Sequence, residues 1–93
     1  MKSLGFIEVS GVVAAVDALD IMCKTSSVSF VVWERRLGGR LVTVIVEGSV
    51  SDVTEAIETA ARRCCGIVAA KNVIASPCEQ TVQMIEYCKA LLE

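Results

Sequence analysis

Apolar residues recur along this chain with two different periods, which divide it into alternating strands and helices. Residues 4–10 form a short apolar run around Glu8 and predict a strand. From Gly11 the apolar spacing changes to three and four, which predicts an amphipathic helix ending near Thr25. The apolar stripe predicted for this helix consists of Val12, Ala15, Val16, Leu19, Met22 and Cys23.

The middle of the chain predicts a hairpin. β-Branched and aromatic residues in SVSFVVWERR, residues 27–36, indicate a second strand, and LVTVIVEG, residues 41–48, indicates a third. A glycine pair at 38–39 lies in the turn between them. Phe30 and Trp33 are separated by an odd number of positions, so in a regular strand they would point to opposite faces.

A second helix is predicted after the hairpin. Ser49 followed by Asp52 resembles a capping box that opens it. Arg62 and Arg63 fall in its last turn, where cations suit the helix dipole, and Gly66 is expected to stop it. Its predicted apolar stripe consists of Val50, Val53, Ile57, Ala60, Ala61 and Cys64.

The last third of the chain predicts one more strand and one more helix. Residues 67–74 indicate the strand, and Ser76 is the expected N-cap of a helix over residues 77–92, with Pro77 in its first position. The apolar stripe of that helix consists of Val82, Ile85, Cys88 and Leu92. The order βαββαβα predicts an α+β fold in which helices pack on one antiparallel four-stranded sheet.

Composition suggests a single small domain that assembles with other chains. With 93 residues, the chain has room for one domain over residues 1–93, with its core predicted over 4–74 and the C-terminal helix beyond it. Hydrophobic residues make up 54% of the chain, and its mean hydropathy is +0.60. A domain of this size buries only roughly two-thirds of its unfolded surface, so apolar patches should remain exposed and mark contacts between chains.

Charge and missing motifs argue against several functions. A net charge of −2 does not favour a nucleic-acid partner, and no apolar run approaches the roughly 20 residues of a membrane span. The chain has no histidine and no glycine-rich phosphate motif, so we expect neither an enzyme nor a bound cofactor or metal. Glu34 and Glu47 flank the hairpin and are interpreted as solvated charges rather than as an acid/base pair.

The cysteines point to a reducing compartment. They are odd in number and show no C-x-x-C spacing, which does not fit a disulfide framework. Three of the five fall on or beside apolar positions of predicted helices, where a free thiol behaves as a small hydrophobe, and a metal or redox role is the alternative. A cytosolic location is expected. The five are Cys23, Cys64, Cys65, Cys78 and Cys88.

Two long segments carry a family resemblance. LGFIEVSGVVAAVDALDIMCKTSSV, residues 4–28, contains L-G-hydrophobic-hydrophobic-E, then a glycine, then an alanine-rich helix ending in D-x-M-x-K. GGRLVTVIVEGSVSDV, residues 38–53, combines a turn, a strand and a helix start. Together they resemble the hexamer-forming shell proteins of bacterial microcompartments, and the resemblance extends from Leu4 to about Ile74.

The resemblance implies a flat cyclic hexamer that tiles edge to edge and has a metabolite pore on its six-fold axis. Gly38, Gly39 and Arg40 match the pore turn, and Lys24 matches the family's edge lysine. Two positions depart from the family pattern. Arg40 replaces a small residue of the pore turn, and Ser76 stands where an edge arginine is frequent.

Arg40 and Lys24 each have a simpler interpretation. A ring of Arg40 side chains would favour an anion in the pore, but Arg40 could instead turn away, either to pair with Glu34 or Glu47 or to lie in solvent. Lys24 could instead cap carbonyl groups in the last turn of its helix.

The implied function is structural. The expected location is the shell of a cytoplasmic microcompartment, and the expected partners are identical subunits, other shell proteins, encapsulated enzymes and permeating small metabolites, with no nucleic acid and no membrane. The alternative is a stand-alone oligomeric regulatory domain that binds a small molecule.

Overall fold

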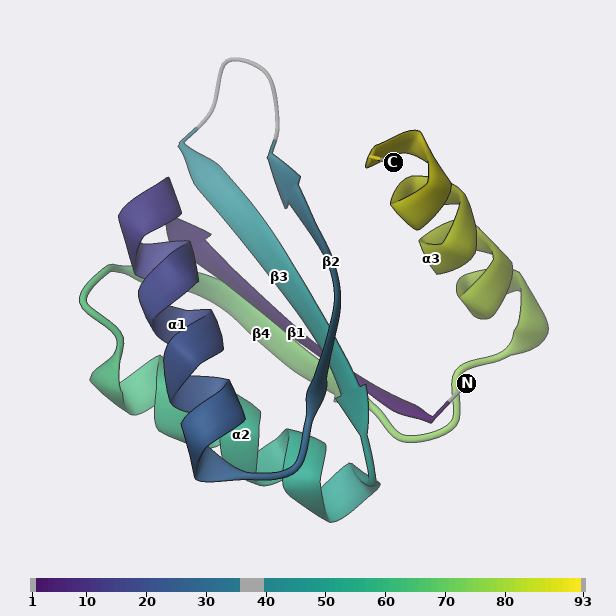
Figure 1. Cartoon of the computed structure of the whole chain (residues 1–93), viewed down its shortest axis with the longest axis horizontal. Helices are drawn as coiled ribbons and strands as arrows, with labels where there is room; N and C mark the ends of the chain where they lie inside the picture. The colour runs from purple at the N-terminus through teal and green to yellow at the C-terminus, as the bar shows by residue number, and fades with distance from the viewer. Residues whose placement is uncertain (1, 36–39, 93) are drawn as a thin grey trace.

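The chain forms one antiparallel four-stranded sheet in the order β2-β3-β1-β4, with three helices packed on it (Figure 1). This confirms the predicted α+β fold. The structure is a computed structural model that describes residues 2–35 and 40–92. Its elements are β1 (Ser3–Ser10), α1 (Val12–Thr25), β2 (Ser29–Arg35), β3 (Leu41–Gly48), α2 (Val50–Arg63), β4 (Val68–Ile74) and α3 (Glu79–Leu92).

The strand register gives the sheet two distinct ends. Ser10 of β1 pairs with Leu41 of β3 at the end where β2 runs out and β3 begins, and we call this the turn end. At the other end, the base end, Ser3 of β1 pairs with Gly48 of β3. Figure 1 shows the turn end at the top of the view. Because α1 follows β1 and leads to β2, it runs from the turn end to the base end.

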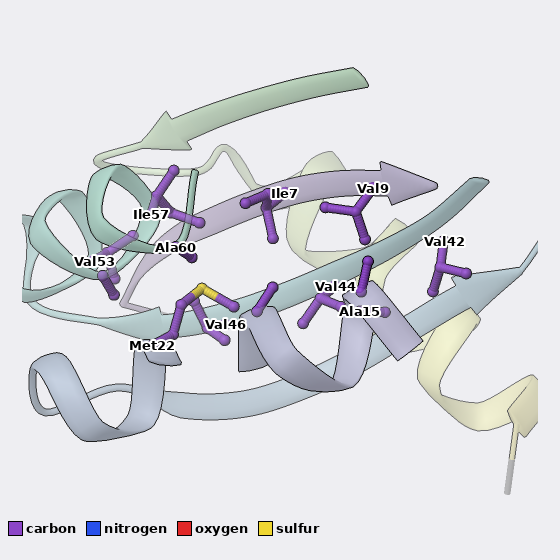
Figure 2. Packing of buried hydrophobic residues seen from close by; sticks show 13 residues of the cluster. Ile7, Val9, Ala15, Met22, Val42, Val44, Val46, Val53, Ile57 and Ala60 are labelled. Atoms are coloured by element: carbon purple, nitrogen blue, oxygen red, sulfur yellow. The ribbon is translucent and has the colours of Figure 1, made fainter. Parts of the chain in front are cut away.

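The main core lies on the face that α1 and α2 cover (Figure 2). Gly5 of β1 lies directly beneath α2, where an added Cβ would come within 2.6 Å of Cγ1 of Val53 and 2.9 Å of Cγ1 of Ile57. The close approach of helix and sheet therefore explains the glycine of the L-G pair. The larger buried side chains of this core are Ile7, Val9, Met22, Val42, Val44, Val46, Val53 and Ile57.

The stripe predicted for α1 was partly wrong. Ala15 and Met22 are buried as expected, but Ala14 and Ala18 complete the buried face. The predicted members Val12 and Val16 are exposed, and so is Cys23. Small side chains let α1 lie close to the sheet and to α2. The predicted stripe followed the larger side chains, so it was rotated around the helix axis relative to the face that is actually buried against the sheet and α2.

A bulge in β2 overturns the prediction for its two aromatic residues. Phe30 pairs with Val46 and Trp33 with Val44, and both of these β3 partners belong to the main core. The register shifts between Phe30 and Val32, so Val31 is an extra residue in the strand. The bulge reverses the alternation, and Phe30 and Trp33 share the face that carries α1.

The third helix covers the opposite face of the sheet. Ile85 of α3 is buried in a second cluster together with Leu4, Val31, Val32 and Ile45. The helix begins at Glu79, and the amide of Val82 donates to the carbonyl of Cys78. The prediction of Ser76 as its N-cap and Pro77 as its first residue was therefore wrong. The Ile85 prediction is confirmed, and the one for Leu92 lies outside the described side chains.

The second helix matches its predicted start. The hydroxyl of Ser49 accepts a hydrogen bond from the amide of Asp52 and donates one to the Asp52 carboxylate. Its end has another cause than the one predicted, since Cys64 already leaves the helical conformation. Gly66 does not adopt positive φ, and it is required because a Cβ there would collide with Cβ of Ala14.

Candidate functional site

Arg40 is the residue of the predicted pore turn that the structure describes. It is exposed and directly precedes β3 at the turn end. Its carbonyl accepts a 2.7 Å hydrogen bond from the amide of Gly11, so the junction between β1 and α1 supports the start of β3. Gly38 and Gly39 lie outside the described residues.

Gly11 can support this junction because of its backbone conformation. It has φ 101° and ψ 153°, a region that residues with a Cβ rarely occupy. An added Cβ would meet nothing within 4 Å, so the requirement for glycine is conformational rather than steric. The residue therefore connects β1 to α1 while its amide holds Arg40.

The strand register separates the two glutamates that flank the hairpin. Glu34 pairs with Thr43, whereas Glu47 pairs with Ser29 at the base end. Arg40 and Glu47 stand at opposite ends of β3, which an extended strand of this length separates by roughly 20 Å. An Arg40–Glu47 pair within one chain is therefore excluded, and so is a Glu34–Glu47 acid/base pair.

Lys24 lies at the base end, in the last turn of α1. Its ammonium forms a 2.8 Å ion pair with Asp20, one helical turn earlier, and both side chains are mostly exposed. The hydrogen bond that the Lys24 ammonium donates to the Asp20 carboxylate, followed by the negative charge of Asp20, raises the pKa of Lys24. Lys24 therefore presents a solvated cation at the base end.

Ser76 lies at the same end of the sheet as Lys24. It is exposed and follows β4 by two residues. The preceding residue, Ala75, is held by a 2.6 Å hydrogen bond that its carbonyl accepts from the Ser3 hydroxyl. The structure thus places both predicted edge residues at the base end and Arg40 at the turn end.

Serine side chains connect the elements of the base end. Besides Ser3, the hydroxyl of Ser26 after α1 donates to the carbonyl of Asp52 in α2 at 2.6 Å. Neither role is visible in the sequence, because a serine that bonds across 72 or 26 positions leaves no local pattern. An open cleft of ≈ 500 Å³ lies here, lined by Lys2, Ser3, Ser27, Gly48, Ser49, Asp52 and Ala75.

All five cysteines are free, but they are less buried than the sequence suggested. Cys64 and Cys88 are half-buried, and the other three are exposed. The sulfur of Cys78 lies 3.3 Å from the hydroxyl of Thr81, and this hydrogen bond lowers the pKa of the Cys78 thiol. Within residues 2–35 and 40–92, no group of three or more Cys, Asp or Glu residues is arranged to hold a metal ion.

The described helices α1, α2 and α3 are each 14 residues long. None of those helices combines the length and the apolar character needed to cross a bilayer.

Comparison with known proteins identifies the family. A family model described as the BMC domain matches residues 3–77. The bacterial microcompartment shell protein PduA of Citrobacter freundii is 42% identical over 78 residues, which cover 82% of this chain and 83% of that protein. The carboxysome shell protein CcmK2 of Synechococcus elongatus is 38% identical over 95 residues, which cover 96% and 92% of the two chains.

A solved structure supports the fold. A microcompartment protein from Desulfitobacterium hafniense superposes with a TM-score of 0.79 at 20% identity, covering 95% of this chain. This chain spans 48% of that longer chain, and the likeness bears on the fold alone. The family match extends from the start of β1 to the residues after β4, and on this evidence the chain belongs to the BMC-domain family of bacterial microcompartment proteins.

Proposed function

We propose that this chain is a structural subunit of a bacterial microcompartment shell, and that it forms cyclic hexamers which tile into facets. The observation that carries the proposal is the family match over residues 3–77, together with relatives that are themselves named as shell proteins. The expected location is accordingly a cytoplasmic microcompartment. Its partners would be other shell proteins and the enzymes enclosed by the shell.

The proposed arrangement assigns a role to each end of the sheet. The turn end, with residues 38–40, lies at the six-fold axis, and the base end, with Lys24 and Ser76, faces outward to the neighbouring hexamers. Arg40 is exposed at one end, whereas Lys24 and Ser76 are exposed at the other, so a single radial orientation suits all three. This geometry supports the assignment.

Arg40 gives the proposed pore its chemistry. Six guanidinium groups near one axis would repel one another unless water or an anion lay between them. Arginine binds phosphate, sulfate and carboxylates with a fork of N–H donors, and rings of arginine select anions in pores. The pore is therefore proposed to favour small anionic metabolites.

Ser76 makes the proposed edge less charged than an arginine would. Serine offers one hydroxyl and no charge, so the cationic contacts of this edge depend on Lys24. Tiling is then more dependent on Lys24 than in a shell protein with two edge cations.

The mass of the purified protein tests the ring. Native mass spectrometry at micromolar concentration should show six times the 9.9 kDa chain mass and little single chain. A stable dimer that binds an amino acid or a nucleotide saturably would contradict the proposal and support the regulatory-domain alternative. A monomer at all accessible concentrations would also contradict it.

A further inference from the structure

An apolar groove runs between α1 and β2 on the surface of the single chain. It has a volume of ≈ 260 Å³, and none of its lining residues is charged or polar. Two of the lining residues are largely open to solvent, since Val16 is 58% exposed and Phe30 is 48% exposed. The α1–β2 groove consists of Ala15, Val16, Leu19, Phe30, Trp33 and Val44.

The β2 bulge creates this groove. Without Val31 as the extra residue, Phe30 and Trp33 would point to opposite faces and one of them would leave the groove. The Arg35 guanidinium lies 5.3 Å from the centre of the Trp33 ring and helps to hold the indole in place. The distorted edge strand thus brings two aromatic side chains together beside the exposed valine of α1.

We propose that the α1–β2 groove is the seat of the neighbouring subunit in the ring, and that the neighbour covers it with its β4 edge near Lys71. This inference rests on the proposed hexamer and names the surface that closes it. Contiguous exposed apolar surface on a small soluble chain usually marks an interface with another chain.

Ring geometry identifies the occupant. The strands β2 and β4 form the two edges of the sheet, and in a closed ring one edge of each copy meets the other edge of the next. In the proposed ring the turn end faces the axis, so position along the strands sets the distance of a segment from the axis. Rotation about the axis preserves this distance. Segments at the same position along the strands of two neighbouring copies therefore come together. Trp33 pairs with Val44, Val44 with Ile7 and Ile7 with Lys71, which places Lys71 at the level of the groove.

The charges of the β4 side suit an apolar groove. Lys71 is paired with Glu58 of α2 at 2.9 Å within its own chain, so its ammonium already has a counter-charge. The aliphatic part of the Lys71 side chain can then contact the groove while the charged end stays on Glu58. Such a contact would leave no unpaired charge in the interface, which would be costly.

The chain contains its own reporter of the groove. Trp33 is the single tryptophan of the sequence, and it lines the groove. On dilution of the unmodified protein, Trp33 emission should shift to longer wavelength and become more accessible to acrylamide as the ring dissociates. The shift should coincide with the loss of the hexamer mass. Emission that stays constant while the mass falls would overturn the inference.

Two matched variants test the groove side. Val16→Asp places a charge in the groove, and Met84→Asp places one on α3, where Met84 is 57% exposed. Val16→Asp should raise the protein concentration at which half of the chains are assembled by at least ~tenfold. Substituting a central side chain of an interface can weaken the binding of the two chains by that much or more. Met84→Asp should assemble like the parent, and circular dichroism should show both variants folded.

The β4 side is tested separately, and this arm remains informative if Val16→Asp fails to fold. Glu58→Gln leaves the Lys71 cation without its counter-charge and should weaken assembly, whereas the pair Glu58→Gln with Lys71→Met should restore it.

If the parent is hexameric and Val16→Asp or Glu58→Gln assembles equally well, the groove or the β4 contact is wrong, while the shell proposal stands. If Met84→Asp disrupts the ring as strongly as Val16→Asp, the assignment to the groove is also wrong. A parent that never forms hexamers would contradict the proposed function itself.

Discussion

The turn end and the base end of the sheet are each stabilised by a different kind of hydrogen bond. At the turn end, Arg40 is held through its backbone carbonyl, which accepts from the amide of Gly11. At the base end, side chains make the connections, because Ser3 and Ser26 donate to carbonyls of distant segments and Ser49 caps α2. The bond that holds Arg40 at the turn end therefore depends on backbone conformation, whereas the base end depends on particular serine hydroxyls.

This difference has a consequence for function. Because the Arg40 side chain takes no part in the bond that holds it, its chemistry can change with little effect on folding. Under the proposed function, the pore end could thus vary its selectivity independently of stability. The base end keeps its shape through the hydroxyls of Ser3, Ser26 and Ser49, so replacing these side chains would cost stability.

The largest loss of stability is predicted for Gly11→Ala. Its φ of 101° is unfavourable for any residue with a Cβ, and such strain costs on the order of 1–3 kcal/mol. We expect the free energy of unfolding to fall by about 2 kcal/mol in urea denaturation at a fixed protein concentration. Arg40→Ala is the control at the same end and should change it by less than about 0.5 kcal/mol. Equal effects of the two substitutions would show that the turn end does not depend on backbone conformation.

A smaller loss is predicted for Ser49→Ala at the base end. The substitution removes the hydroxyl that accepts from the amide of Asp52, and the loss of such a cap costs about 1 kcal/mol. Ser76→Ala, an exposed serine at the same end, is the control and should stay within about 0.5 kcal/mol of the parent. The same urea titration measures both. A Ser49→Ala variant as stable as the Ser76→Ala variant would show that the Ser49 cap does not stabilise the base end.

The smallest effect on folding, but a large one on assembly, is predicted for Lys24→Ala. Its exposed ion pair with Asp20 contributes little to stability, so hexamers should remain while extended sheets seen by negative-stain electron microscopy disappear. Lys24→Arg should retain the sheets. A variant that loses its hexamers, or tiles like the parent, would refute the edge assignment.

The charge of Lys24 also predicts a pH dependence. Asp20 raises the pKa of Lys24, so the ammonium stays protonated to a higher pH than an isolated lysine, whose pKa is about 10.4. If sheets depend on this charge, they should persist from neutral pH up to at least that value. Loss of sheets below pH 9, with hexamers intact, would point to a group other than Lys24.

Sequence patterns predicted the order of the elements, because strand and helix periods are local. They also found the cap at Ser49, where the two partners are three residues apart. They failed where the cause lay elsewhere in the fold. The buried face of α1 is set by its close approach to the sheet, and the face of Phe30 is set by a bulge that depends on pairing with β3. Gly66 is required because of Ala14, a neighbour from another element.

The candidate site was predicted from the family resemblance rather than from its chemistry. Arg40, Lys24 and Ser76 are exposed polar residues in short connections or at a helix end, and their local patterns fit many solvated surfaces. Their placement at opposite ends of the sheet follows from the register of β1, β3 and β4. The register is a long-range property, which the sequence shows only through the resemblance.

The most direct test of the account is electron cryomicroscopy of the assembled protein in sulfate buffer, at a resolution that shows side chains. The account predicts six copies around one axis, with residues 38–40 nearest the axis, an anion beside Arg40, and Lys24 and Ser76 on the outer boundary. A closed ring with Lys24 nearest the axis, or one whose Arg40 side chains all point away from an empty axis, would contradict it.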